Sequence, residues 1–206
     1  MTSHPLVLAT RNTGKIEEFR RILEEIAPGQ VELIGLESFP HLGDVEETGN
    51  SFEENSLLKA RTICQATGIS AIADDSGLCV DFLGGDPGIY SARWSGVHGD
   101  DKANLEKVLA QLAQIPREKR GAHFTCVTSF VTPTGNEVTQ EGILKGYILT
   151  EPIGSFGFGY DPIFAPLGNE LSLAQMSAEA KDAISHRGQS LRAIAPRVTQ
   201  MLAALG

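Results

Sequence analysis

The sequence has few cysteines, few aromatic residues and no excess of positive charge. Its three cysteines, Cys64, Cys79 and Cys126, are odd in number and form no CxxC pair, which favours buried free thiols over disulfides or a zinc site. With a formal net charge of −9, the chain lacks the broad basic face that a protein gripping long nucleic acids needs. We therefore expect no nucleic-acid polymer as a partner, whereas a free nucleotide needs only a few local cations and a metal.

Long apolar runs are also absent. No stretch approaches the roughly 18 to 20 apolar residues of a membrane span, and the apolar run near the N-terminus is too short for a signal sequence. We expect a cytoplasmic protein with no membrane partner. The 206 residues are 41% hydrophobic, enough for a full core, and no linker, repeat or low-complexity segment divides them.

Short apolar segments alternate with amphipathic ones in the first half of the chain, and this pattern predicts an α/β fold around a mixed sheet. The predicted strands cover residues 6–10, 31–36, 69–73, 78–83, 122–132 and 137–149. The predicted helices begin near Lys15, Ser51, Asp100 or Asp101, and Ala178. A capping box, Ser51 to Glu54, and Gly68 mark the two ends of the second helix. Pro196 should kink or split the last one.

Two adjacent carboxylates, Asp74 and Asp75, follow the predicted strand 69–73 and precede Ser76 and Gly77. Ligands bind at the carboxyl ends of strands in open α/β sheets, and a carboxylate there can hold a divalent cation or activate a water. Because extended residues alternate faces, the two side chains should point opposite ways. A polar turn after a buried strand has the same composition, so this segment alone does not decide between a site and a turn.

A second polar segment, Thr10-Arg-Asn-Thr-Gly-Lys15, lies between the first predicted strand and the first predicted helix. Backbone N–H groups at a helix start attract phosphate, and a lysine adds a mobile positive charge. The segment is not a Walker A loop, since no earlier glycine is present and Ile16 follows the lysine. An ordinary turn that caps a helix is the alternative interpretation.

An acidic pair, Glu46-Glu47, precedes Lys59, which shares a helix face with Asn55. One of these glutamates could join Asp75 around a hard cation such as Mg²⁺, which prefers one or two carboxylates plus phosphate oxygens. A solvated acidic loop beside a surface lysine would explain the same residues.

Two later segments could contact a base. Phe156-Gly-Phe-Gly-Tyr-Asp161 interleaves aromatics with glycines in a chain that is only 6% aromatic, and aromatic faces stack on nucleobases. It could equally cover the core. Lys181 and the run Ser185-His-Arg187 could read the polar edge of a base or hold a phosphate, or could be ordinary surface residues.

Taken together, the motifs occur in a specific order. They are Thr-x-Asn-x-x-Lys, Glu-Glu-Thr-Gly, Phe-x-Glu-Asn, Ala-Asp-Asp-Ser-Gly-Leu, Pro-Gly-Ile-Tyr-Ser-Ala-Arg, Phe-Gly-Tyr-Asp-Pro-Ile-Phe and Ile-Ser-His-Arg-Gly. From about Leu6 to Leu191 the chain resembles the inosine triphosphate pyrophosphatase family, the XTP/dITP diphosphatases. The resemblance implies one two-lobed α/β domain over residues 1–206, with a long, twisted, mixed sheet flanked by helices. It also implies an active cleft between the lobes and, usually, a homodimer.

The resemblance further implies Mg²⁺-dependent hydrolysis of noncanonical purine nucleoside triphosphates (ITP, dITP and XTP) to the monophosphate and pyrophosphate. Asp75 would be the general base on the attacking water, with support from Asp74, and Glu47 and Asp75 would hold the metal. Lys59 would be a further catalytic residue that assists in binding the triphosphate. The substrate-binding positions would be Thr10, Arg11, Asn12, Thr13, Gly14, Lys15, Ser76, Phe158, Gly159, Tyr160, Asp161, Lys181, His186 and Arg187. The first six would bind the triphosphate, and the last few would lie near the base.

Several alternatives stay open at this point. Glu46 and Glu47 can exchange roles, as can Asp74 and Asp75. Ala180 stands where the family often has a second glutamate, and residues 41–44 and 99–102 follow no family pattern, so the substrate range could differ there. The same motifs could serve pyrimidine or modified nucleotides, or a nucleotide-binding module without turnover. A purely structural α/β domain would leave the polar motifs unexplained.

Overall fold

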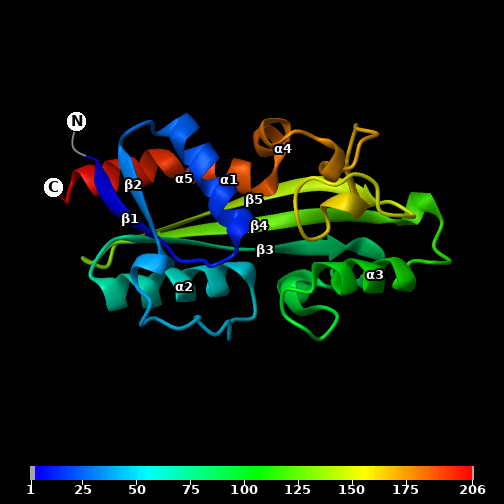
Figure 1. Cartoon of the computed structure of the whole chain (residues 1–206), viewed down its shortest axis with the longest axis horizontal. Helices are drawn as coiled ribbons and strands as arrows, with labels where there is room; N and C mark the ends of the chain where they lie inside the picture. Colours follow the sequence, from blue (N-terminus) through cyan, green and yellow to red (C-terminus); the bar gives the residue numbers. More distant parts are fainter. Residues whose placement is uncertain (1–2, 206) are drawn as a thin grey trace. The chain divides into compact units, whose positions relative to one another are not determined.

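The computed structural model describes residues 3–205 as an α/β fold (Figure 1). The helices are α1 (Thr13–Ile26), α2 (Phe52–Thr67), α3 (Asp101–Gln111), α4 (Ala178–Ile184) and α5 (His186–Ala203). The strands are β1 (His4–Leu8), β2 (Val31–Gly35), β3 (Ala71–Val80), β4 (Gly121–Val131), β5 (Glu137–Ile148) and β6 (Phe164–Pro166). They form one sheet in the order β2-β1-β3-β4-β5-β6. Since β1 runs parallel to β2 and β3 while β5 and β6 are antiparallel, the predicted mixed α/β sheet is confirmed.

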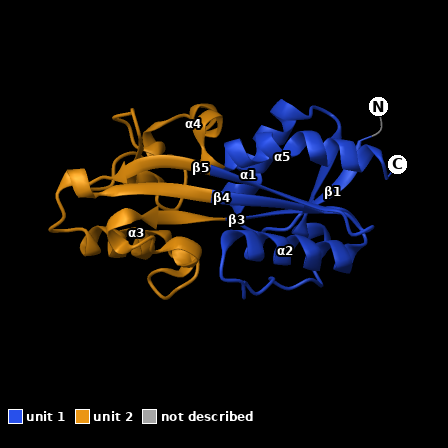
Figure 2. Cartoon of the chain, turned by 180° about the vertical axis from the view of Figure 1, so that it is seen from behind, with its two compact units in different colours: residues 1–75, 126–142, 187–206 blue, residues 76–125, 143–186 orange. Residues whose placement is uncertain are grey.

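The chain divides into two compact units, coloured separately in Figure 2. Unit 1 takes in residues 1–75, 126–142 and 187–206, and unit 2 takes in residues 76–125 and 143–186. The three longest strands, β3, β4 and β5, each contribute residues to both units. Within residues 3–205, no helix is long and apolar enough to cross a membrane.

Unit 1 packs helices on both faces of its part of the sheet, with α1 and α5 on one face and α2 on the other (Figure 1). The α1 helix begins where the Asn12 side chain accepts a hydrogen bond from Lys15 N at 3.0 Å. Phe19 and Ile22 of its apolar stripe are fully buried and pack with residues of β1 and α5. Pro196 does not split the last helix, because α5 runs through that residue, and the chain leaves the helical conformation at Ser185, between α4 and α5.

The α2 helix has the ends that its sequence predicts. Ser51 Oγ accepts a hydrogen bond from Glu54 N at 3.1 Å, and Gly68 closes the helix in the left-handed conformation, with φ of 69°. Ser56 Oγ donates to the Ala73 carbonyl oxygen at 3.1 Å and so ties the helix to β3. These contacts fix which face of α2 is turned toward the middle of β3.

An exposed ion pair joins α2 to the start of β5. Arg61 Nε lies 2.7 Å from Glu137 Oε1, and Arg61 Nη2 lies 2.5 Å from Glu137 Oε2. The hydrogen bond from Arg61 lowers the pKa of Glu137, so the pair stabilises the fold above the unfolded-state pKa of a glutamate, and this contribution is lost as the pH falls through the folded-state pKa.

We expect Arg61→Met to lower the free energy of unfolding by at most about 1 kcal/mol at pH 7, because both side chains are partly exposed to water. The difference between variant and parent should shrink as the pH is lowered from about 5 to about 3. Urea denaturation at several pH values measures it, and an equal loss at every pH would contradict the assignment to the ion pair.

Strand β3 corrects one prediction. The pattern predicts two strands, 69–73 and 78–83, with the carboxylates at the end of the first and a turn as the alternative, but the structure has one ten-residue strand that runs through Asp74 and Asp75. Gly77 makes this possible, because a Cβ atom there would lie 2.2 Å from the Gly88 carbonyl oxygen. The carboxylates therefore lie in the middle of a central strand and not at its end.

Unit 2 has its own core, built on residues of β3, β4 and β5. Leu78, Phe124 and Ile163 are among its buried members, and α3 adds Leu105 and Val108. The α3 helix begins at Asp100, whose Oδ1 accepts a hydrogen bond from Ala103 N at 3.0 Å. Unit 2 thus has a buried apolar core of its own, to which the α3 helix contributes.

Candidate active site

Asp75 is the centre of a buried polar cluster in unit 1. Its Oδ1 lies 3.3 Å from Lys59 Nζ, and its Oδ2 accepts a hydrogen bond of 3.1 Å from Asn55 Nδ2. Asn55 and Lys59 stand one turn apart on α2, so a single helix presents both groups to the carboxylate. Lys59 Nζ also donates to Glu47 Oε1 at 2.7 Å.

The surroundings of this cluster shift the pKa values of its members. Burial raises the pKa of Asp75, and the Glu47 charge raises it further, against the opposing effects of Lys59, Lys15 and Asn55. Burial by itself would lower the pKa of Lys59, but the charges of Asp75, Glu47 and Asp74 outweigh it, and the net direction is upward. Asp75 is therefore a stronger base than an exposed aspartate, held beside a lysine that keeps its proton.

Asp74 points away from Asp75 and meets a different set of cations. Its Oδ2 lies 3.0 Å from Lys15 Nζ, and Arg187 donates to the same atom from Nη2 at 3.0 Å and from Nε at 3.2 Å. Burial opposes ionisation of Asp74, but Lys15, Arg187 and Lys59 outweigh it and lower its pKa strongly. Asp74 is thus a fixed negative charge, whereas the proton affinity of Asp75 is raised.

Arg187 is the largest fully buried side chain of the described residues. Besides Asp74, its guanidinium pairs with Glu18 of α1, so two carboxylates from distant parts of the chain share it. The sequence predicts Arg187 as a substrate contact and does not single out Glu18. The one signal for Glu18 is a charged residue next to Phe19, inside the apolar stripe of α1.

Cys126, on β4, is buried against the same cluster. Its Sγ lies 3.7 Å from Asp74 Oδ2. Burial raises the pKa of Cys126 to about 12, and the Asp74 charge contributes to the shift. Cys64 and Cys79 are also free and buried, as the cysteine pattern predicts.

The segment from Thr10 to Gly14 leads into α1, which begins at Thr13. Thr10 Oγ1 accepts a hydrogen bond from Asn12 N at 3.2 Å, and the Asn12 side chain caps the helix. Arg11 points to the 41–44 segment, where it donates to the Leu42 carbonyl oxygen at 2.7 Å and to Asp44 Oδ1 at 3.1 Å. Lys15, in the first turn of the helix, connects this segment to Asp74 through its ion pair.

The two carboxylates around Lys59 are suitable ligands for a divalent cation that also binds a phosphate. Glu47 and Asp75 converge on one ammonium group, and Mg²⁺ takes one or two carboxylates and completes its shell with phosphate oxygens and water. Between residues 3 and 205 there is no group of three or more His, Cys, Asp or Glu side chains that could enclose a metal ion by themselves. Of the two neighbouring glutamates, Glu47 pairs with Lys59 and is partly buried, while Glu46 is exposed.

Unit 2 holds a second polar group, built around Asp161. Its Oδ2 accepts hydrogen bonds from Lys181 Nζ at 2.5 Å and from Phe158 N at 2.9 Å. Lys181 Nζ lies 4.7 Å from the centre of the Phe158 ring. The His186 ring stacks on Phe124, with ring centres 4.7 Å apart and planes at 9°. A half-buried aromatic ring and a buried lysine thus meet at Asp161, and unit 2 also holds a buried histidine stacked on Phe124.

The structure therefore sorts the predicted residues into two groups. Unit 1 brings together Lys15, Glu47, Lys59, Asp74, Asp75 and Arg187, with the 10–14 segment leading into Lys15. Unit 2 brings together Phe158, Asp161 and Lys181, flanked by Gly159 and Tyr160, and contains Ser76 and His186 as well.

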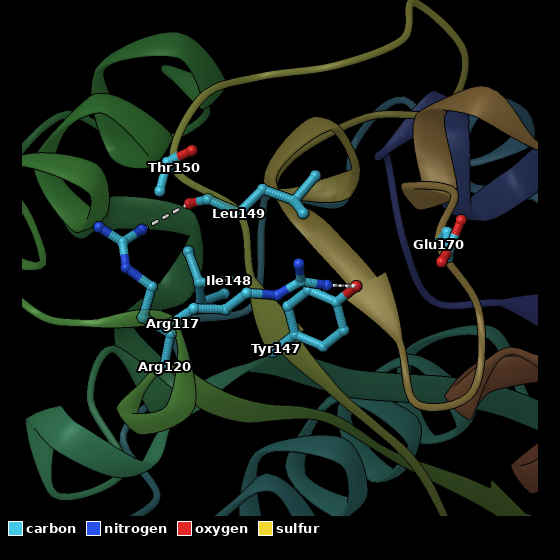
Figure 3. Close-up of a pocket in the computed structure, with 7 residues that line it drawn as sticks. All are labelled: Arg117, Arg120, Tyr147, Ile148, Leu149, Thr150 and Glu170. Atoms are coloured by element: carbon cyan, nitrogen blue, oxygen red, sulfur yellow. Dashed lines mark hydrogen bonds between the residues drawn. The ribbon is translucent and has the colours of Figure 1, made fainter.

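A cavity of about 340 Å³ lies elsewhere in unit 2 (Figure 3). Its lining residues are Arg117, Arg120, Tyr147, Ile148, Leu149, Thr150 and Glu170, none of which is a predicted site residue. The Arg120 guanidinium donates to the carbonyl oxygens of Leu112, Ile115 and Leu149, and Arg117 donates to Tyr147 Oη. The guanidinium groups of Arg117 and Arg120 are thus already hydrogen-bonded to other groups of the protein.

The fold and the two groups define an α/β protein whose central strand carries buried carboxylates paired with cations. Residues 6–197 match the Ham1 family, and the chain belongs to that family. The family resemblance predicted from the motifs is confirmed.

The chain is similar to several known proteins over nearly its whole length. It is 53% identical to a dITP/XTP pyrophosphatase of Streptomyces coelicolor over 197 residues, which cover 96% of this chain and 98% of that protein. A crystal structure of the nucleoside-triphosphatase, or dITP/XTP pyrophosphatase, from Mycobacterium abscessus is 50% identical, with a TM-score of 0.75 over 93% of this chain and 99% of that one. A HAM1 protein structure from Coxiella burnetii is 35% identical, with a TM-score of 0.84 over 96% and 99% of the two chains.

Proposed function

We propose that this protein hydrolyses noncanonical purine nucleoside triphosphates, namely ITP, dITP and XTP, to the monophosphate and pyrophosphate. The observation that carries the proposal is Asp75, a buried carboxylate of raised pKa that is held by Asn55 and Lys59 and stands beside Glu47. The names of relatives about half identical to this chain support the substrate class.

In this proposal Asp75 takes a proton from the attacking water. Lys59 and Asn55 hold its two oxygens, so the carboxylate has one orientation from which to accept that proton. Glu47 and Asp75 would hold Mg²⁺, which supplies positive charge to offset the triphosphate and the pyrophosphate leaving group. Lys59 remains charged beside them and adds to the same effect.

Lys15 and the start of α1 would bind the phosphate chain, because backbone N–H groups at a helix start and a lysine both attract anions. Asp74 forms an ion pair with Lys15, and Asp74 is in turn paired with Arg187, which also pairs with Glu18. We therefore assign Arg187 a positioning role in unit 1, in place of the substrate contact that the motif predicts.

The base would contact the residues of unit 2. Phe158 offers a ring for stacking, and Lys181 and His186 offer N–H groups that a 6-oxo purine can accept from. The 6-amino group of adenine cannot accept such bonds, so a site built on them discriminates against it. We extend the proposal to a homodimer located in the cytoplasm, on the family resemblance alone.

Incubation with Mg²⁺ and ITP, followed by chromatography of the products, tests the proposal. We expect IMP and pyrophosphate in equal amounts, with dITP and XTP cleaved in the same way and ATP cleaved much more slowly. IDP and phosphate would contradict the cleavage position. Unchanged ITP would contradict the enzyme and favour a nucleotide-binding module, and preferred cleavage of a pyrimidine triphosphate would contradict the substrate class.

A further inference from the structure

The segment 99–102, which follows no family pattern, contacts the loop formed by residues 154–160, here called the glycine-aromatic loop. Asp100 and Asp101 are adjacent in the sequence but accept hydrogen bonds from different parts of unit 2. Asp100 caps α3, whereas Asp101 Oδ2 accepts a hydrogen bond of 2.8 Å from Gly159 N. Both partners belong to unit 2.

The glycine-aromatic loop is held at separate points along its length. At its start, Ser155 N and Phe156 N both donate to the Ala174 carbonyl oxygen at 3.0 Å. At its end, Tyr160 Oη donates to the Ser91 carbonyl oxygen at 2.8 Å. Between these points two successive backbone N–H groups are held by carboxylates, Phe158 N by Asp161 and Gly159 N by Asp101.

The middle of this loop needs such restraints. Gly157 and Gly159 have φ values of +74° and +61°, and glycines of this kind visit many other conformations when nothing holds them. Phe158 lies between them, so the backbone conformation of the two glycines determines where its ring is placed. Asp161 is buried and tied to Lys181, while Asp101 is exposed and reaches the loop from α3. The Asp101 charge also adds to the effect of burial in raising the pKa of Tyr160, as expected for a carboxylate close to the loop.

We propose that Asp101 is a positioning residue for substrate binding, which fixes the Phe158 ring by holding Gly159 N. The proposal rests on the proposed function, since it assigns the Phe158 ring to the base. A loop that is held in one conformation before binding loses less conformational entropy when the substrate binds. The residue therefore acts on KM and not on the cleavage step, whose groups lie in unit 1.

Three variants test this role. Asp101→Ala removes the acceptor, Asp101→Asn keeps an oxygen that can accept from Gly159 N, and Asp100→Ala is the matched control that removes the neighbouring cap. We expect Asp101→Ala to raise KM for ITP about three- to tenfold while kcat stays within about twofold, the effect of one lost hydrogen bond. Asp101→Asn should stay near the parent, and Asp100→Ala should lower the Tm without changing KM.

Amide hydrogen exchange at Gly159 provides a readout that needs no substrate. We expect faster exchange at Gly159 in Asp101→Ala, and parent-like exchange in Asp101→Asn and Asp100→Ala. The proposal is overturned if Asp101→Ala leaves either KM or the Gly159 exchange unchanged, or if Asp100→Ala raises KM equally. If the parent does not cleave ITP at all, the proposed function fails, while the exchange experiment still decides whether Asp101 holds the loop.

Discussion

Asp75→Asn lowers the rate of pyrophosphate release from ITP by about 10²- to 10⁴-fold, because the amide cannot take a proton from water. The substitution keeps the size of the side chain and one oxygen for Lys59 or Asn55, so the fold should persist. Steady-state kinetics measures the loss, and circular dichroism and thermal unfolding check the fold. Binding of ITP, measured by titration calorimetry, should remain detectable.

Two comparison variants make this result specific. Glu24→Gln removes a carboxylate from the exposed side of α1 in the same unit and should leave the kinetics unchanged. Asp74→Asn removes the neighbouring carboxylate, which holds Lys15, and should weaken substrate binding more than it slows cleavage. Full turnover in Asp75→Asn together with its loss in Asp74→Asn would show that the two roles are exchanged.

Arg187→Leu lowers the free energy of unfolding by about 3 to 5 kcal/mol, since it leaves Glu18 and Asp74 buried without the cation that they share. Urea denaturation followed by circular dichroism measures this change. Arg187→Lys should restore only part of the loss, because an ammonium group cannot present the planar fork that contacts two carboxylates together.

Arg192→Met on the same helix is the matched control. Arg192 pairs with Glu25 at 2.8 Å on the surface, where an ion pair contributes at most about 1 kcal/mol. A loss in Arg187→Leu no greater than in Arg192→Met would contradict the view that Arg187 is the central cation of a buried network.

Much of the fold could be predicted from local patterns. The ends of α2 follow from Ser51 and Gly68, and the two long strands β4 and β5 follow from alternating residues on either side of a Pro-Thr-Gly turn. These signals are local, so a single sequence carries them. The order of the motifs likewise located most of the candidate site.

The continuity of β3 could not be predicted, because its cause is not local. Two adjacent aspartates followed by serine and glycine have the composition of a turn. In the fold, the charge of Asp74 is balanced by Lys15 and Arg187, which lie far away in the sequence, and the missing side chain of Gly77 admits a neighbouring backbone. A charged side chain can be buried only where oppositely charged groups lie close to it, and here those groups come from distant parts of the sequence.

Glu18 and Asp101 were missed for the same reason. Glu18 is separated from Arg187 by 169 positions, and Asp101 is separated from Gly159 by 58. The sequence marks Glu18 only by its place inside the apolar stripe of α1, and Asp101 looks like an ordinary surface acid at the start of α3. Their importance is visible only in the partner that each one contacts.

The Cys126 thiol has a consequence for the charge of the unit 1 cluster. A thiolate at this position would compete with Asp74 for Lys15 and Arg187 and would change the net charge of the cluster with pH. Because the pKa of Cys126 is raised to about 12, the sulfur stays neutral throughout the physiological range. Cys126 thus fills space beside the buried carboxylate of Asp74 without adding a second anion next to Lys15 and Arg187.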